Sequence, residues 1–256
     1  MTPLHRLKHF RDRSLEKLHL RLAAREAQFQ LALLGMLSGV VAGAAMVCFQ
    51  LAIEIPQAFF LGTDNPENYE ALHPLLRLLL PTVGGLLVGW FFHRLASADR
   101  AVGVVHVMER LAYGEGILPI KNAGVQFLSA TLCILFGHSV GREGPSIHIG
   151  AACASWMGQK IRLPHNSIRV LVGCGTAGAI AAAFNTPLAG VIFTMEVVLV
   201  EYTLASFTPI ILAAVSATMV SRWALGSDYI FAVPALKLGA LGDLFHVTLM
   251  GVGIGL

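Results

Sequence analysis

The sequence predicts an all-α integral membrane protein, and three observations support this fold class. First, 55% of the 256 residues are hydrophobic and 13% are charged, with a mean hydropathy of +0.69, a balance outside that of soluble domains. Second, several apolar stretches approach or exceed the roughly 20 residues that one helical crossing of a bilayer needs. Third, Gly and Pro interrupt apolar segments where the backbone should lie within the bilayer. Such irregular backbone survives there only where protein or a water-filled cavity covers it.

The pattern of basic and apolar residues at 1–28 predicts a basic amphipathic helix at the membrane surface. The positive-inside rule places this segment in the cytoplasm. The net charge of +3 and the pI of about 8.8 would also suit a nucleic-acid partner. Because the basic segment leads directly into an apolar span, lipid headgroups are the favoured partner and no nucleic acid is expected. The basic side chains are those of Arg6, Lys8, Arg11, Arg13, Lys17, Arg21 and Arg25.

Residues 29–256 predict one transmembrane domain. Pro74 and Pro81 predict an irregular start to its second span. A short amphipathic helix is expected at 104–112, between the second and third spans. The chain ends inside another apolar run, so we expect the domain to continue past Leu256. The predicted spans are 29–55, 75–92, 123–140, 171–195 and 207–221.

Two breaks in the apolar pattern, at 137–145 and 184–190, predict helices that end within the membrane. The residues that mark the second break are Asn185, Pro187 and Gly190. Broken helices that point their ends at a central site are a known transporter arrangement. The sequence therefore predicts a binding site formed by helix ends rather than by a cluster of charged side chains.

The stretch Gly141-Arg142-Glu143-Gly144-Pro145 places a carboxylate at the start of a helix at membrane depth. An ionisable group there is costly, and it indicates an ion or proton path. The N–H groups of a first helical turn carry positive partial charge and attract anions. The two glycines allow a ligand to approach the backbone closely. We therefore expect an anion site at the backbone of Gly141, Arg142 and Gly144.

The motif at 141–145 is followed about forty residues later by Phe-Asn-Thr-Pro-Leu-Ala-Gly at 184–190, and then by Glu196. Both motifs at this spacing resemble the CLC family of chloride channels and proton-coupled chloride transporters. The resemblance covers nearly the whole chain from residue 29 onward and implies a CLC-like bundle of tilted and broken transmembrane helices. It further implies a homodimer in the cell (inner) membrane, with one chloride pathway in each subunit and no cofactor.

In this family the glutamate that matches Glu143 is the gating residue. The resemblance implies that its carboxylate competes with chloride for the same N–H groups and that protonation relieves this competition. The family usually has Gly-Ser-Gly-Ile-Pro where this chain has Ala-Val-Gly-Val-Val at 101–105. Val102 replaces the serine that helps to hold the anion, which leaves the backbone of Val102, Gly103 and Val104 as the expected contacts. The arginine beside the gating residue, Arg142, is expected to fix the helix start through its side chain.

Many proton-exchanging members carry a second glutamate directly after the position of Glu196, where this chain has Val197. This difference favours a voltage-gated-type chloride channel and leaves a proton-coupled exchanger open. Glu196 itself is a structural acid or part of a proton path. A distant alternative is a membrane-embedded metalloenzyme, with Glu143 beside His138, His148 and Cys153. Because the chain lacks a His-Glu-x-x-His motif and a nucleophile motif, we expect no catalytic residue and no metal ligand.

Overall fold

A computed structural model describes residues 27–61, 69, 72–200, 204–226 and 241–255, and every regular element in these ranges is helical. This confirms the predicted all-α class. The predicted surface helix at 1–28 falls almost entirely outside the described residues. The helices are α2 (Ala27–Leu61), α3 (Pro74–Arg94), η2 (Ser97–Arg100), α4 (Gly103–Tyr113), α5 (Ile120–Leu135), α6 (Glu143–Ile161), α7 (His165–Phe184), α8 (Pro187–Phe193), the π-helical η3 (Thr194–Leu199), α9 (Leu204–Leu225) and α10 (Leu241–Gly255).

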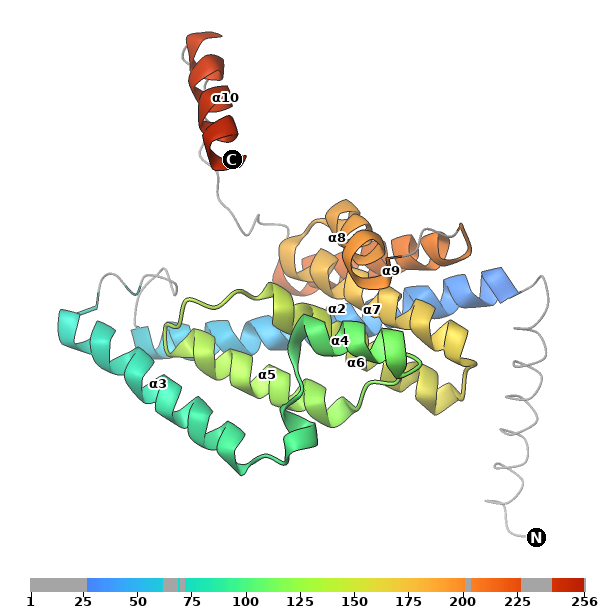
Figure 1. The fold of residues 1–256 in the computed structure, drawn as a ribbon, viewed down its shortest axis with the longest axis horizontal. Coiled ribbons are helices and arrows are strands. Elements are labelled where there is room, and N and C mark those ends of the chain that lie inside the picture. The colour runs from blue at the N-terminus through green and yellow to red at the C-terminus, as the bar shows by residue number, and fades with distance from the viewer. Residues whose placement is uncertain (1–26, 62–68, 70–71, 201–203, 227–240, 256) are drawn as a thin grey trace.

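Helix α7 forms the centre of the bundle, with α2, α6 and α9 packed around it (Figure 1). Small residues bring these helices close together, as is common where helices associate within lipid. A Cβ on Gly150 of α6 would collide with the carbonyl oxygen of Gly175 on α7. Likewise, a Cβ on Gly39 of α2 would collide with the carbonyl oxygen of Ala213 on α9. The glycines are therefore packing surfaces at these crossings.

Four of the described helices are long and apolar enough to cross a bilayer, and they correspond to four of the five predicted spans. These helices are α2, α3, α7 and α9. The predicted span at 123–140 is too long, because α5 ends at Leu135. Gly137 then adopts φ +73°, a left-handed conformation that glycine tolerates and that ends the helix. The span predicted at 171–195 is divided between α7 and α8 at the second predicted break.

Helix α3 corrects one expectation, because it is continuous where an irregular start was predicted. Pro74 is its first residue, a position at which the missing N–H would have no helical partner in any case. Pro81 lies inside the helix and is accommodated without ending it. The prolines therefore fix the start of α3 but do not divide it.

Candidate functional site

The first element of the candidate site is the start of α6, where Glu143 is the first helical residue. The N–H of Ser146 donates to the carbonyl of Arg142 at 3.0 Å, and the Ser146 hydroxyl donates to the same oxygen at 2.7 Å. Pro145 has no N–H, so the bond from Ser146 is the first helical hydrogen bond of α6. The N–H groups of Glu143 and Gly144 come before it and have no partner within the helix. This end of α6 therefore presents amide donors of the kind that bind anions.

The Glu143 side chain is exposed and folds back beside Gly141. A Cβ on Gly141 would collide with the Oε2 atom of Glu143. Around Gly144, in contrast, a Cβ would meet no atom within 4 Å. One glycine thus leaves space for the carboxylate, and the other has open space where a side chain would stand.

The second element is the start of α4, which follows the extended residue Val102. Val102 gives no side-chain cap to the helix, so its first amides receive no hydrogen bond from that residue. Gly103 has φ +85°, a conformation that side chains rarely adopt. The expected contacts at Val102, Gly103 and Val104 therefore stand at a helix start, as at Glu143.

A buried amide that the sequence analysis did not identify holds this second helix start in place. The Asn122 side chain, 2% exposed, donates to the carbonyls of Ala101 at 2.8 Å and Ala98 at 3.1 Å. Asn122 belongs to α5, so one side chain fixes the segment that leads into α4. An amide side chain near the start of an apolar helix was the sequence signal that could have indicated it.

The two helix starts belong to helices that are joined by a histidine pair. His106 Nδ1 on α4 lies 3.1 Å from His148 Nε2 on α6, and both side chains are buried. The other ring nitrogen of His148, Nδ1, is buried without a hydrogen-bond partner in the described part of the chain. The sequence analysis named His148 only in the metalloenzyme alternative, and it did not identify His106. His138, the other histidine of that alternative, instead contacts the Cys133 carbonyl at 3.1 Å.

The second break separates α7 from α8. Asn185 ends α7 in the left-handed conformation, and its side-chain oxygen accepts a hydrogen bond from Arg222 Nε at 2.7 Å. Pro187 begins α8, and Gly190 packs so closely that a Cβ would lie 2.6 Å from the Ala177 carbonyl. These three motif residues thus have structural roles at the break.

Glu196 lies in η3, which continues from α8 and packs against α4. Its side chain is exposed, and no hydrogen bond to Glu143 is present in the described part of the chain. η3 therefore packs against α4, the helix that begins at Gly103, but Glu196 is not hydrogen-bonded to Glu143. Within the described residues, no three His, Cys, Asp or Glu side chains converge as they would to hold a metal ion.

Comparisons with known proteins give concordant results. A family model described as voltage gated chloride channel matches residues 84–256. A ClcB-like chloride channel protein of Ralstonia nicotianae is 30% identical over 230 residues, which are 88% of this chain and 53% of the relative. A voltage-gated ClC-type chloride channel, ClcB, of Escherichia coli O139:H28 is 32% identical over 208 residues, 78% of this chain and 49% of the relative. The chain thus spans about half the length of these curated relatives.

Two solved structures share the fold. A CLC-type fluoride/proton antiporter aligns with a TM-score of 0.67 and 24% identity, covering 91% of this chain and 56% of its own. A slow cyanobacterial Cl⁻/H⁺ antiporter aligns with a TM-score of 0.68 and 22% identity, covering 87% of this chain and 53% of the antiporter chain. At these sequence identities, the two structures show only that the helices are arranged in the same way.

Proposed function

Because the chain belongs to the CLC family, whose members are ion channels and antiporters and not enzymes, we propose that it forms the N-terminal part of a membrane domain that moves chloride. In this proposal residues 29–256 belong to the transmembrane domain, and residues 1–28 lie at the cytoplasmic membrane surface. The protein acts as a homodimer in the inner membrane and needs no cofactor. Because members of this family are not enzymes, the metalloenzyme alternative has no support.

In this proposal Glu143 is the gating residue. The observation that carries the proposal is its position as the first residue of α6, beside amide donors and the open space next to Gly144. A carboxylate and a chloride ion are both monovalent anions, so both are attracted to the same helix start. When Glu143 accepts a proton, it loses the charge with which it competes, and chloride gains access. Proton and chloride occupancy are thereby linked through one side chain.

The chloride site is formed by backbone amides at the starts of α4 and α6. At α4 the contacts come from Val102, Gly103 and Val104, because Val102 has no hydroxyl to offer. At α6 they come from Gly141, Arg142 and Gly144. Selectivity at the α4 end then depends on amide geometry, which Asn122 and the histidine pair hold in place.

We propose passive conduction, because Val197 stands where many exchangers have a second acid. Proton-coupled exchange is the second candidate, and the position of Glu196 in η3 against α4 favours it. The reversal potential of the full-length protein under a pH gradient distinguishes the two. A channel reverses at the chloride equilibrium potential, whereas an exchanger reverses at a potential displaced by the proton gradient.

Chloride efflux from liposomes tests the proposed role of Glu143. We expect Glu143→Ala in the full-length protein to retain chloride movement and to lose its dependence on pH. Glu109→Ala is the matched control, because Glu109 is an exposed acid on α4 away from the helix start. Efflux from Glu143→Ala with the pH dependence of the wild type would count against the gating role.

A further inference from the structure

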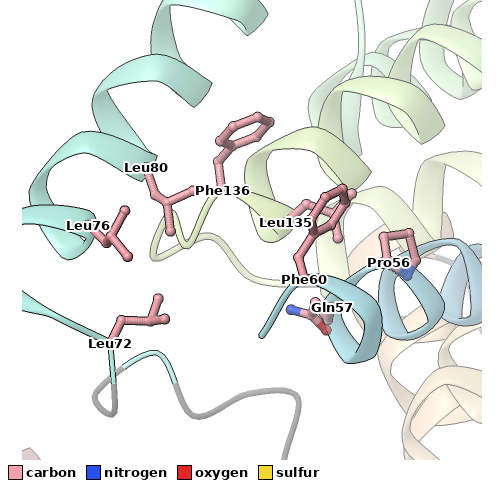
Figure 2. A pocket seen from close by; sticks show the side chains of 8 residues that line it. All are labelled: Pro56, Gln57, Phe60, Leu72, Leu76, Leu80, Leu135 and Phe136. Atoms are coloured by element: carbon pink, nitrogen blue, oxygen red, sulfur yellow. The ribbon is translucent and has the colours of Figure 1, made fainter. Parts of the chain in front are cut away.

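Helix α3 has one buried contact with the rest of the bundle. Of its 21 residues, all of which lie in the described ranges, Gly84 alone is buried. In Figure 1 α3 lies at the edge of the bundle, beside α5. Toward the start of α3, a cavity of about 320 Å³ lies between its leucines and the end of α2 (Figure 2). The packing of α3 therefore depends chiefly on the contact at Gly84.

Gly84 makes this contact with the turn that follows α5. A Cβ on Gly84 would collide with the Cβ of Phe136 and would lie 2.8 Å from Cε1 of His138. The Cβ of Phe136 is attached to the backbone, so the two segments would have to move apart to admit a methyl group. Whichever of them moved, the close packing between α3 and the turn would be lost. Gly84 is thus the position at which α3 supports Phe136 and His138.

Hydrogen bonds make this turn a rigid continuation of α5. The backbone N–H of His138 donates to the carbonyl of Cys133 at 3.0 Å. The ring Nδ1 of His138 donates to the same oxygen at 3.1 Å, because a carbonyl can only accept. The N–H of Val140 then donates to the His138 carbonyl at 2.8 Å, and two residues later the chain reaches Glu143. A displacement at His138 is therefore transmitted to the start of α6.

Tyr69 holds the same turn from a second direction along the chain. Its hydroxyl donates to the carbonyl of Ile134 at 2.9 Å and accepts a hydrogen bond from Nε2 of Gln57 at 2.8 Å. Its ring lies against Gly137, where a Cβ would stand 3.2 Å from the nearest ring atom. Gln57 belongs to the spanning helix α2 and is 3% exposed. The turn at 136–138 is thus held by α3 and, through Tyr69, by α2.

The other end of this segment meets the Glu143 carboxylate. A Cβ on Gly141 would collide with Oε2 of Glu143, so the backbone of Gly141 bounds the position that the carboxylate occupies. We propose that Gly84 and Tyr69 are positioning residues for Glu143. They hold the turn at 136–138, and the turn determines where Gly141 meets the carboxylate. This role rests on the gating function proposed for Glu143.

Chloride efflux from liposomes over a series of pH values tests this role in the full-length protein. Gly84→Ala separates α3 from the turn, and we expect the pH of half-maximal efflux to rise by at least about 0.5 unit. The reason is that a carboxylate displaced from its amide donors accepts a proton more readily. Gly89→Ala is the matched control, because it makes the same change in α3 where a Cβ meets no atom within 4 Å. It should keep the wild-type pH of half-maximal efflux.

Tyr69→Phe is a second variant, which adds no atom and therefore does not crowd the helix contact. It loses the hydrogen bond to Ile134, and it should shift the pH of half-maximal efflux in the same direction. Neither variant should change efflux in a Glu143→Ala background, because no carboxylate is left to position. His138 and Arg142 are the other ionisable side chains of the segment, and a shift caused by them would persist in that background.

The outcomes separate this role from the gating function. If Glu143→Ala loses its pH dependence while Gly84→Ala and Tyr69→Phe keep the wild-type pH of half-maximal efflux, the positioning role alone is overturned. A shift that persists in the Glu143→Ala background, or an equal shift in Gly89→Ala, would also overturn it. Wild-type pH dependence in Glu143→Ala itself would overturn the gating function together with this inference.

Discussion

His106 Nδ1 and His148 Nε2 lie 3.1 Å apart in the buried contact between α4 and α6. A hydrogen bond between two ring nitrogens needs a donor on one ring and a lone pair on the other. At least one of the two rings is therefore neutral in this arrangement. The pair joins the two helices whose starts form the proposed chloride site, so it relates the packing of the bundle to the geometry of that site.

Removal of one histidine should leave the other without its partner. We expect His106→Ala to lower the free energy of unfolding by about 1 to 3 kcal/mol, because both ring nitrogens of His148 are then buried and unpaired. Thermal unfolding in detergent measures the change. The double variant with His148→Ala should show a coupling energy of about 0.5 to 3 kcal/mol. Strictly additive effects would contradict a hydrogen bond between the two rings.

The close crossing of α6 and α7 predicts that Gly150→Ala is destabilising. The added methyl group would collide with the Gly175 carbonyl and the Ala179 side chain, so we expect a loss of about 1 to 3 kcal/mol in unfolding free energy. Gly124→Ala is the control, since a Cβ there meets no atom within 4 Å and α5 continues on both sides. That variant should be neutral or more stable by up to about 1 kcal/mol, because alanine favours helix. Equal melting temperatures for the two variants would exclude the proposed close contact.

Asn122 should affect the chloride site without being part of it. Asn122→Leu removes both hydrogen bonds to the segment before α4, so we expect weaker chloride binding in the full-length protein and a loss of about 1 to 3 kcal/mol in stability. The pH dependence proposed for Glu143 should persist, because no hydrogen bond joins Asn122 to that residue in the described part of the chain. Lys121→Ala should change stability by about 1 kcal/mol or less, since the Lys121 side chain that pairs with Asp99 is 67% exposed. Chloride titration and thermal unfolding measure both variants, and wild-type values for Asn122→Leu would contradict its positioning role.

The local features of the fold could be predicted from the sequence, because they depend on neighbouring residues. Apolar length predicted the spanning helices, and Asn185 and Pro187 predicted the second break. The span predicted at 123–140 was too long, although the first predicted break begins at Gly137, whose left-handed conformation follows the end of α5.

The long-range contacts could not be predicted in the same way. His106 and His148 are 42 positions apart, and no local pattern determines which faces of α4 and α6 meet. The hydroxyl of Tyr69 reaches the carbonyl of Ile134 across 65 positions for the same reason. Asn122 was overlooked because its partners are backbone carbonyls, which leave no trace in the sequence. Packing of the whole bundle determines all three contacts.

The central claim is that the Glu143 carboxylate and chloride compete for one set of amide donors, and chloride affinity as a function of pH tests it most directly. Isothermal titration of the full-length wild type should show tighter chloride binding as the pH falls, because protonation removes the competing charge. Glu143→Gln, which is neutral at every pH, should bind chloride more tightly than the wild type at neutral pH, with an affinity that does not change with pH. An affinity in Glu143→Gln that follows the wild-type pH dependence would contradict the account.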